Sequence, residues 1–457
     1  MAKYKAYPEY KDSGVEWLGC VPTGWLITEL KRYSWVKGGY AFSSDSFISF
    51  GEPVIRIGDI SQDGSINLEN CKYVSHILAK QSRSYTVRNG ELLMAMTGAT
   101  IGKAGFYECE FPALINQRVG LFKVLDNLMH YRFLWYTLKS YGYQEYIKLT
   151  AFGGAQPNIS DVGMVGYRTT VPSLQEQSRI ASFLDHETAK IDNLIENQQQ
   201  LIELLKEKRQ AVISHAVTKG LNSDVPMKDS GVEWLGEVPE HWGVTRLKYE
   251  CRNIVDCPHS TPNYTDEGEY PAIRTADIFA GYLDLENCRR VTESVYDERN
   301  FRLIPRVGDI IYSREGERFG IGAPIPEGAK VCLAQRVMLF RAKSTPGYLM
   351  WALNSSSTYT QAQQDCIGST SPHVNVDTIK NFILAWPPEN EREEISNFIH
   401  QTLDSVESLT AHLTEKLTLL QERRTALISA AVTGKIDVRD WVAPDTQDVE
   451  EPQEATA

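Results

Sequence analysis

The sequence has no apolar run that approaches the roughly 18 residues of a membrane-spanning helix, and residues 1–11 contain no apolar stretch typical of a signal peptide. We therefore expect a cytoplasmic protein without a membrane segment. Its eight cysteines include no Cys-x-x-Cys pair, and the short motif Cys257-Pro-His259 has no second ligand pair. This spacing predicts reduced, mostly buried thiols and no zinc site.

The chain also lacks an excess of basic residues, since its net charge is −12. That value disfavours a nucleic-acid partner only if the charge is spread evenly. It is not, because residues 437–457 carry seven acidic groups and one basic group, whereas residues 20–170 carry 15 basic and 12 acidic groups. Composition therefore neither proposes nor excludes binding to DNA.

Motifs of nucleotide, cofactor and hydrolytic chemistry are missing. The stretch from Gly98 to Lys103 has three residues instead of four between its glycines, and Ala104 follows where a phosphate-binding loop has Ser or Thr. There is no Gly-x-Gly-x-x-Gly, His-Glu-x-x-His or Gly-x-Ser-x-Gly. Pro387-Pro388 is followed by Glu389, not by the aromatic residue of an amino-methylating DNA enzyme. No motif of these kinds indicates an enzyme, and the features that remain are typical of a binding protein.

The most prominent feature that is present is an internal repeat. The nine residues KDSGVEWLG at 11–19 recur letter for letter at 228–236, and we call these two stretches the duplicated segments. Similarity continues in register through PVIRIGDI (53–60) and PAIRTADI (271–278) to AVISHAVTKG (211–220) and ALISAAVTGK (426–435). The chain is thus one unit written twice, each copy spanning nearly half of the sequence, followed by an acidic tail.

Each repeat ends in a predicted long amphipathic helix. No Pro or Gly occurs from Ser173 to Thr218, and apolar residues recur every seven positions, interrupted only by Gln198. The second repeat carries the same stripe, and two such stripes bury each other best. The predicted pairing residues are Leu184, Ile191, Leu205 and Val212 in the first helix, with Ile180, Leu194 and Leu201 beside them, and Ile399, Val406, Leu413, Leu420 and Leu427 in the second. The alternative is a pair of core helices in one large domain, but an uncapped run beyond about 25 residues argues against it.

About 150 residues follow each duplicated segment, with short β-type runs separated by Gly, Asn-Gly and Asp-Gly, which is typical of a mixed α/β domain. The predicted fold class is α+β: two similar mixed α/β domains joined by two long helices that pair as an antiparallel coiled coil, with internal pseudo-two-fold (cyclic) symmetry. The predicted parts are an N-terminal segment (1–19), a first domain (20–170), a first helix (171–219), a second segment (220–236), a second domain (237–386), a second helix (387–436) and an acidic disordered tail (437–457).

This order of segment, domain and helix, written twice, resembles the specificity subunit of type I restriction-modification systems (HsdS) over residues 7–436. The resemblance rests on the duplicated KDSGVEWLG with its following Val-Pro and Trp, on PVIR..DI and PAIR..DI, and on the helix openings VPSLQEQSRIASFL (171–184) and PPENEREEISNFI (387–399). The second opening has Glu391-Arg392 where the family usually has Glu-Gln, so we expect a weaker contact at Arg392.

The resemblance implies a subunit that catalyses nothing itself and reads double-stranded DNA with two target-recognition domains. It also implies assembly with two methyltransferase (modification) subunits and two restriction/translocase subunits. No cofactor is then expected on this chain, and S-adenosylmethionine, ATP and Mg²⁺ are expected on the partner subunits. The alternative is a coiled-coil scaffold that binds only proteins, which predicts no salt-sensitive DNA affinity in the assembled complex. A self-contained nuclease or methyltransferase would need a donor or metal site that the motifs do not supply.

Base edges are read by Arg or Lys at guanine, by Asn or Gln at adenine, and by Ser or Thr at either. Polar loops rich in these types occur at corresponding places in both domains. The candidate DNA-binding residues are Lys37, Tyr40, Ser43, Ser44, Thr97, Thr100, Lys103, Gln156 and Asn158 in the first domain, and His259, Ser260, Thr261, Arg314, Arg318, Ser369, Thr370 and His373 in the second.

The dipeptide Gln117-Arg118 recurs as Gln335-Arg336. Domains that read different sequences should differ where they touch bases, so we expect this pair to be structural or to contact phosphate. Four tryptophans of the repeat are expected to pack each duplicated segment onto its domain, namely Trp17, Trp25, Trp234 and Trp242.

Overall fold

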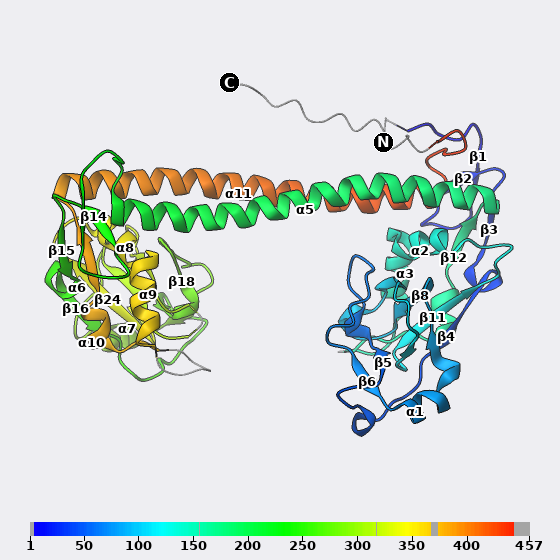
Figure 1. Ribbon diagram of the computed structural model, residues 1–457, viewed down its shortest axis with the longest axis horizontal. Helices are drawn as coiled ribbons and strands as arrows, with labels where there is room; N and C mark the ends of the chain where they lie inside the picture. Colours follow the sequence, from blue (N-terminus) through cyan, green and yellow to red (C-terminus); the bar gives the residue numbers. More distant parts are fainter. Residues whose placement is uncertain (1–3, 155, 317, 367–372, 443–457) are drawn as a thin grey trace. The chain divides into compact units, whose positions relative to one another are not determined.

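The computed structural model describes residues 4–154, 156–316, 318–366 and 373–442. The chain divides into two compact units, of which unit 1 comprises Met1–Gln198 with Glu415–Ala457, and unit 2 comprises Gln199–Thr414. Two long helices, α5 (Leu174–Lys219) and α11 (Glu389–Val432), confirm the predicted helices (Figure 1). The boundary between the units falls inside both helices, so one part of each helix belongs to unit 1 and the other part to unit 2.

Short strands and helices make up the rest of both units. In unit 1 they are β1 (Tyr10–Asp12), β2 (Cys20–Pro22), β3 (Leu26–Glu29), β4 (Ser34–Gly38), β5 (Glu52–Ile55), β6 (Lys72–Val74), α1 (His76–Gln81), β7 (Thr86–Val87), β8 (Glu91–Ala95), β9 (Ala104–Tyr107), β10 (Ala113–Ile115), β11 (Val119–Val124), α2 (Tyr131–Lys139), α3 (Tyr141–Thr150), α4 (Asp161–Val165) and β12 (Arg168–Val171). In unit 2 they are β13 (Met227–Asp229), β14 (Glu237–Pro239), β15 (Gly243–Arg246), α6 (Leu247–Glu250), β16 (Cys251–Asp256), β17 (Tyr270–Ile273), β18 (Ile278–Phe279), β19 (Tyr282–Leu283), β20 (Arg290–Val291), α7 (Glu293–Arg299), β21 (Ile310–Ser313), β22 (Ile321–Pro324), β23 (Cys332–Leu333), β24 (Val337–Ala342), α8 (Pro346–Leu353), α9 (Ser356–Gln364), α10 (Val376–Lys380) and β25 (Ile383–Trp386).

The two units have corresponding sheets. Unit 1 contains the sheet orders β4-β11-β8-β9 and β6-β5-β10-β7, and unit 2 contains β16-β24-β21-β22 and β20-β17-β23. In each second sheet one pair is parallel, β10 with β5 and β23 with β17. The first and last strands of each domain also pair, β3 with β12 and β15 with β25. Both units are therefore mixed α/β structures, as the residue pattern predicts.

Alternation along strand β8 builds the core of unit 1. Leu92 and Met94 point to the helical side and join a cluster with residues of α2, α5 and α11, whereas Leu93 and Ala95 join a cluster with the second sheet. In Figure 1 the helices α2 and α3 lie between this sheet and the long helices. Because burial of a large apolar side chain contributes about 1.5–3 kcal/mol, this sheet buried on both faces anchors the domain.

The repeated Arg-x-x-Asp of PVIRIGDI and PAIRTADI forms the same local turn in each unit. The Asp59 carboxylate accepts a hydrogen bond of 2.8 Å from the backbone N–H of Arg56, and Asp277 does the same for Arg274 at 2.8 Å. Both carboxylates are nearly buried. The recurrence of this motif therefore has a structural cause.

The predicted apolar stripe of the long helices is largely buried. Leu184, Ile191, Leu205, Ile399, Val406, Leu413, Leu420 and Leu427 are all at most 9% exposed. The predicted position Val212 is wrong, because it is half-buried while Ile213 is 1% exposed. Leu194 and Leu201 are also exposed, at 47% and 38%. A helix of 3.6 residues per turn drifts away from a strict seven-residue spacing, so the buried face moves to the next residue.

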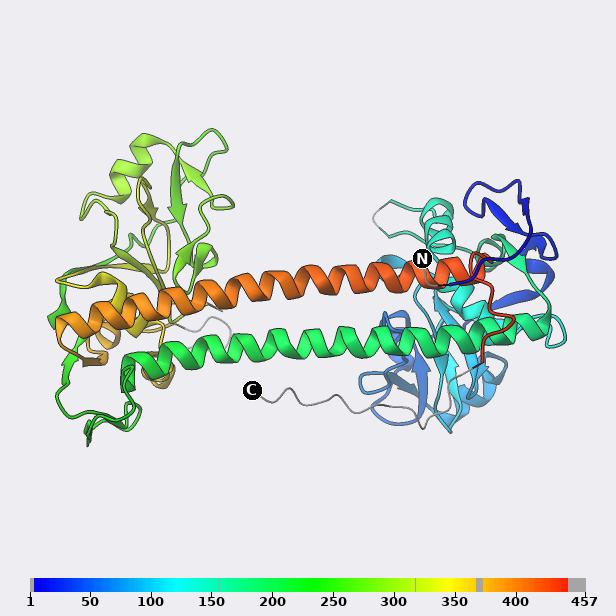
Figure 2. The same ribbon diagram turned by 90° about the horizontal axis from the view of Figure 1, so that it is seen from above.

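The predicted disorder of the tail begins too early, because residues 437–442 pack in unit 1. Val438 is 1% exposed, the ring of Trp441 lies edge-on to Phe183 at 5.6 Å, and the backbone N–H of Asp437 donates to the Lys5 carbonyl at 2.8 Å. Figure 2 shows the N-terminal stretch, in blue, beside the end of α11, in red. The two ends of the described chain are thus neighbours within unit 1.

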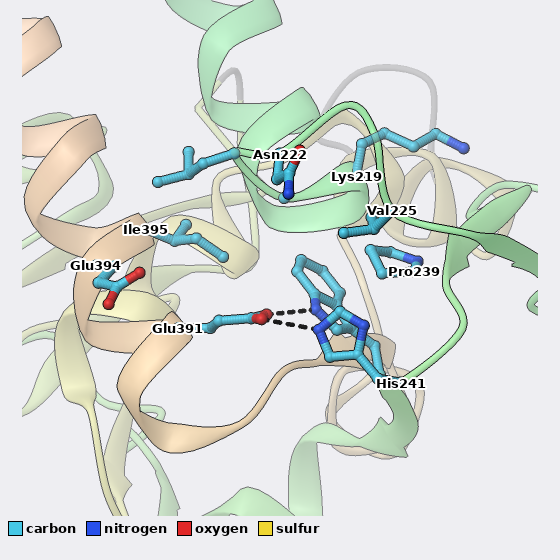
Figure 3. A pocket seen from close by; sticks show the side chains of 11 residues that line it. Lys219, Asn222, Val225, Pro239, His241, Glu391, Glu394 and Ile395 are labelled. Carbon is cyan, nitrogen blue, oxygen red and sulfur yellow. Dashed lines mark hydrogen bonds and ion pairs between the residues drawn. The ribbon is translucent and has the colours of Figure 1, made fainter.

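A glutamate at each helix opening holds the segment that precedes the domain. In unit 2 the Glu391 carboxylate accepts hydrogen bonds from the Trp242 indole at 2.6 Å and from His241 at 2.8 Å (Figure 3). In unit 1 the corresponding Glu176 accepts from the Tyr7 hydroxyl at 2.6 Å. The two carboxylates, at equivalent positions of the repeat, therefore both hold the preceding segment, although their hydrogen-bond donors differ.

The expected weakness at Arg392 is wrong. Its counterpart Gln177 is fully buried and bonds backbone groups, among them the N–H of His130 at 2.8 Å. Arg392 is 7% exposed, donates to Ser344 and Thr345 at 2.9 and 2.7 Å, and stacks on the ring of Trp386 at 4.5 Å. A longer cation thus replaces the amide with contacts of its own.

The tryptophans and cysteines are placed mainly as predicted. Trp25 and Trp242 are buried, whereas Trp17 is 48% exposed. All eight thiols are free and five of them are buried, and burial raises the pKa of Cys251 and Cys332 to about 12, so these thiols stay protonated near neutral pH. In the described ranges no helix is long and apolar enough to cross a membrane.

Candidate nucleic-acid interface

Three predicted loops of unit 1 meet at one edge of its sheets. The backbone N–H of Gly39 donates to Val119 at 3.1 Å, Met96 donates to Arg118 at 2.9 Å, and Ile159 donates to Met96 at 3.0 Å. These bonds join the loop after β4, the loop after β8 and the strand-like stretch before α4. The predicted residues of the three loops are thereby brought to one surface.

Unit 2 repeats this arrangement bond for bond. Cys257 donates to Val337 at 3.1 Å, Arg314 donates to Arg336 at 3.2 Å, and Val374 donates to Arg314 at 3.0 Å. Each donor and acceptor is the repeat equivalent of a residue in unit 1. The two units therefore present loops of different sequence on the same backbone frame.

Close packing fixes the loop after β4. A side chain at Gly39 would place its Cβ 2.2 Å from the carbonyl oxygen of Asn116, which only glycine avoids. Tyr40 then exchanges backbone hydrogen bonds of 2.9 Å with Ile115 and Gln117. The ring of Tyr40 is 37% exposed at this surface.

The candidate residues of unit 1 differ in how free their side chains are. Tyr40, Ser43, Ser44 and Gln156 are exposed, Lys37, Thr100, Lys103 and Asn158 are half-buried, and Thr97 is buried. The Thr97 hydroxyl is buried without a hydrogen-bond partner, and Lys37 donates to the Ser84 carbonyl. Exposed side chains next to a fixed backbone suit the reading of a ligand, so Tyr40 and Gln156 are the better placed candidates.

Unit 2 has an ion network at the same edge. The Arg314 guanidinium bonds Asp256 at 3.1 Å and Glu315 at 2.9 Å, and its side chain is only 8% exposed. Glu315 also pairs with Arg336 at 3.3 Å, and His259 lies 3.4 Å from Asp256. The prediction that Arg314 reads bases is thus disfavoured, because its guanidinium is already paired with two carboxylates and holds two loops together.

The other candidates of unit 2 lie around this network. Thr261 accepts a hydrogen bond of 2.7 Å from Gln335, and the exposed Ser260 accepts one of 2.7 Å at its carbonyl from Arg299. Arg318 is exposed and stacks on Phe279 at 4.3 Å. A backbone bridge joins Glu315 and His373, which is half-buried. Ser369 and Thr370 lie outside the described residues.

The Gln-Arg dipeptides occupy the centre of both surfaces. Gln117 and Arg118 are exposed in the turn that joins β10 to β11, and Arg336 is exposed in the equivalent turn. Arg336 has a φ of 65°, a left-handed conformation that is costly for a residue with a side chain. The sequence signal for this position was its recurrence, which by itself favours a structural role as much as a binding role.

Among the residues that the structure describes, no group of three or more His, Cys, Asp or Glu side chains could hold a metal ion. Unit 1 offers exposed hydroxyl, amide and phenol groups beside Arg118, and unit 2 offers exposed hydroxyl and imidazole groups beside Arg318 and Arg336. Such groups suit hydrogen bonding to base edges and contact with phosphates.

Comparison with known proteins gives one consistent answer. A family model for the type I restriction modification DNA specificity domain matches residues 22–206 and 252–419. The chain is 23% identical over 443 residues to the EcoKI specificity subunit of Escherichia coli K12, covering 93% of this chain and 92% of that protein. It is 24% identical over 453 residues to the EcoBI specificity subunit of Escherichia coli, covering 95% and 91%.

A solved chain from a study of complex assembly and conformational transition of the type I R-M system has the same fold. It aligns with a TM-score of 0.68 and 15% identity over 91% of this chain and 99% of that chain. Members of the family are non-catalytic DNA-recognition subunits. From the match to most of both repeats, the chain belongs to the family of specificity subunits of type I restriction-modification systems.

Proposed function

We propose that this chain recognises a bipartite DNA target, with one half-site read by each domain, and carries the methyltransferase and restriction subunits of its complex. The observation that carries the proposal is the pair of equivalent loop surfaces. The same three backbone hydrogen bonds hold loops whose side chains differ between the units. Two domains that share a backbone arrangement but present different side chains suit a DNA target with two different halves.

Within each surface we assign different tasks to different side chains. Tyr40, Ser43, Ser44 and Gln156 in unit 1, and His259, Thr261 and Arg318 in unit 2, are exposed or nearly so and differ between the repeats, which suits base reading. Arg118 and Arg336 recur in both and suit phosphate contact, which positions the domain without selecting a sequence. Arg314 positions the loops that carry its neighbours.

The long helices are proposed to pair as an antiparallel coiled coil with pseudo-two-fold symmetry. Two ion pairs support this: Asp192 of α5 with Arg424 of α11 at 2.6 Å, and Glu407 of α11 with Arg209 of α5 at 3.3 Å. Each partner is the repeat equivalent of the other, with the helices exchanged. From the first pair to the second, the sequence advances from Asp192 to Arg209 in α5 and retreats by the same number of positions, from Arg424 to Glu407, in α11.

The partners follow from the family. One modification subunit per repeat and one restriction/translocase subunit for each of these would give two copies of both, in the cytoplasm. S-adenosylmethionine, ATP and Mg²⁺ would then act on those subunits. This chain would recognise the DNA, set the distance between the half-sites through its helices, and give the complex its symmetry.

Exchange of one domain tests the proposal. Residues 20–170 are replaced by the corresponding domain of a relative, and methylated sites are mapped across the genome of cells that carry the complete system. We expect one half-site to change and the other to persist. The matched control exchanges residues 237–386 and should change only the other half. If both halves change, or if the assembled complex shows no salt-sensitive DNA affinity, the proposal is wrong and a purely protein-binding scaffold is favoured.

A further inference from the structure

The identity of the duplicated segments is only partly explained by their fold. In unit 1 the Asp12 carboxylate accepts the backbone N–H of Gly14 at 3.0 Å, and Gly14 has a φ of 63°, as a tight turn requires. Leu18 is 2% exposed in a small apolar cluster with Val15. The copy in unit 2 repeats the turn. These residues are the same in both copies because both copies must fold in the same way.

The fold does not explain in the same way why the glutamate and the tryptophan are identical in the two segments. Glu16 and Glu233 are exposed, and within the described residues neither makes a hydrogen bond or an ion pair. Trp17 is 48% exposed: one face of its ring stacks on Tyr167 at 5.8 Å, and its indole N–H donates to a backbone carbonyl at 3.1 Å. Internal packing therefore uses only part of the Trp17 surface and none of Glu16.

An open cavity borders Trp17. It has a volume of about 600 Å³ and is walled by aromatic rings of Trp17, Tyr141 and Tyr167 on one side and by the last turns of α11 on the other. Tyr141 is 62% exposed there. Exposed rings grouped around a cavity and rimmed by polar side chains are typical of a binding surface.

Unit 2 has a smaller cavity, of about 250 Å³, beside Glu233 and Trp234, and its other lining residues are the polar side chains Ser356, Ser357, Thr360 and Gln364 of α9. The Trp234 indole N–H is buried there without a hydrogen-bond partner. The helix face that lines the first cavity recurs in the sequence, with Glu422, Ala426, Ser429 and Thr433 of α11 repeated as Glu207, Ala211, Ser214 and Thr218 of α5. In both units the serine of this set accepts a backbone N–H at 2.9 Å from the start of the neighbouring short helix.

We infer that the Glu-Trp pair of each duplicated segment, with the helix face beside it, binds one copy of the same partner, the modification subunit. The occupant brings an apolar side chain to the tryptophan and a Lys or Arg to the glutamate. This inference rests on the proposed function and names the surface that carries out its scaffolding part.

Two arguments select a protein partner over DNA. Surfaces that read two different half-sites must differ, whereas the two Glu-Trp pairs are identical, so they fit one ligand bound twice. An exposed glutamate directly before the tryptophan also repels phosphate, whereas it complements a basic side chain of a protein. The identity of the two copies thus points to a ligand that is present in two equal copies.

The test measures how many modification subunits bind the full-length chain. Purified modification subunit of the same system is titrated against wild type, Trp17→Ala, Trp234→Ala and the double variant, with the mass of the complex read by native mass spectrometry. Buried tryptophans at interfaces are typical hot spots, so each single change should weaken one of the two sites by about 30-fold or more and leave a complex with one modification subunit. The double variant should bind neither copy at concentrations that saturate the wild type.

Loss of folding is separated from loss of binding by a second pair of variants. Glu16→Lys and Glu233→Lys alter side chains that have no internal hydrogen bond or ion pair among the described residues, so they should weaken binding in the same pattern without a change in thermal unfolding. Phe111→Ala is the matched control, because this ring is 53% exposed on the β9–β10 loop, outside the surface, and should leave both sites intact.

The outcomes distinguish this inference from the proposed function. If wild type binds two modification subunits and the double tryptophan and double glutamate variants do so with unchanged affinity, the inference is overturned and the proposed function stands. If wild type binds no modification subunit, both fail.

Discussion

The left-handed residue Arg336 allows a quantitative test of the loop surface of unit 2. Substitution Arg336→Gly removes a strain of about 1–2 kcal/mol, because glycine adopts a φ of 65° freely. Against this stand about 0.5–1 kcal/mol of extra freedom in the unfolded chain and about 0.2–1 kcal/mol for the exposed pair with Glu315. The net change in the free energy of unfolding therefore lies between about −1 and +1.3 kcal/mol, with a central value close to zero.

The repeat supplies the matched control. Arg118 has the equivalent position, but its φ is not positive, and it makes no ion pair among the described residues. Arg118→Gly therefore gains no strain relief and should destabilise unit 1 by about 0.5–1 kcal/mol. The central values of the two ranges therefore differ by about 1 kcal/mol, with Arg118→Gly the more destabilising change.

Hydrogen exchange of the full-length chain measures both effects at once. Amides of β24 report the stability of unit 2 and amides of β11 that of unit 1, so in each variant the unaltered unit is the internal reference. A gap of about 1 kcal/mol corresponds to a roughly fivefold difference in exchange rate. Equal destabilisation by both variants would refute the strain argument. In the assembled complex each variant should also lower the salt slope of DNA binding by about 0.9, because one phosphate contact is lost.

Three further predictions follow from other features. A permuted chain that starts at Asn222, with Val442 joined to Tyr4 by a short Gly-Ser linker, should fold and support modification in cells, because residues 4–10 already contact residues 434–440. Aggregation at normal expression would contradict this. Insertion of four residues near Gln198–Gln200, with a matching insertion in α11, should lengthen the unread spacer by one or two base pairs, since about 6 Å of helix is added and a base pair rises about 3.4 Å. A methylation map with an unchanged spacer would show that the helices do not set the distance between the half-sites. Burial lowers the pKa of Lys139 to about 8, so this amine loses its proton at a lower pH in the folded chain than in the unfolded chain. The stability of unit 1 should therefore rise between pH 8 and pH 10. Denaturation curves taken across that range should show this increase in the wild type but not in Lys139→Met.

Much of the fold could be predicted because it is written twice. Periodicity identified α5 and α11, and the recurrence of Arg-x-x-Asp marked turns that the structure shows to be alike. The details that failed depend on geometry that periodicity does not contain. Val212 and Ile213 differ by one position on a helix, and the packing of Trp441, near the end of the chain, depends on Phe183 in the first repeat.

The candidate site was harder to predict for a physical reason. Sequence shows which side chains could bind DNA, but not whether they are already engaged. Arg314 is bound by two carboxylates, whereas Arg336 nearby is exposed, although both are arginines in polar loops. Only the three-dimensional arrangement distinguishes a buried arginine that positions a loop from one that is exposed enough to meet a phosphate.

The division of both long helices between the units has a consequence for synthesis on the ribosome. Unit 2 is one continuous stretch, but the core of unit 1 includes Leu427, Ile428 and Val432, which are made only after the whole of unit 2. At about 5–20 residues per second, the half of α5 in unit 1 waits roughly 10–50 s for its partner half of α11. During that interval the cluster that contains Leu184 and Ile191 lacks its residues from α11, so part of the apolar surface of the first-made half is open to non-native contacts.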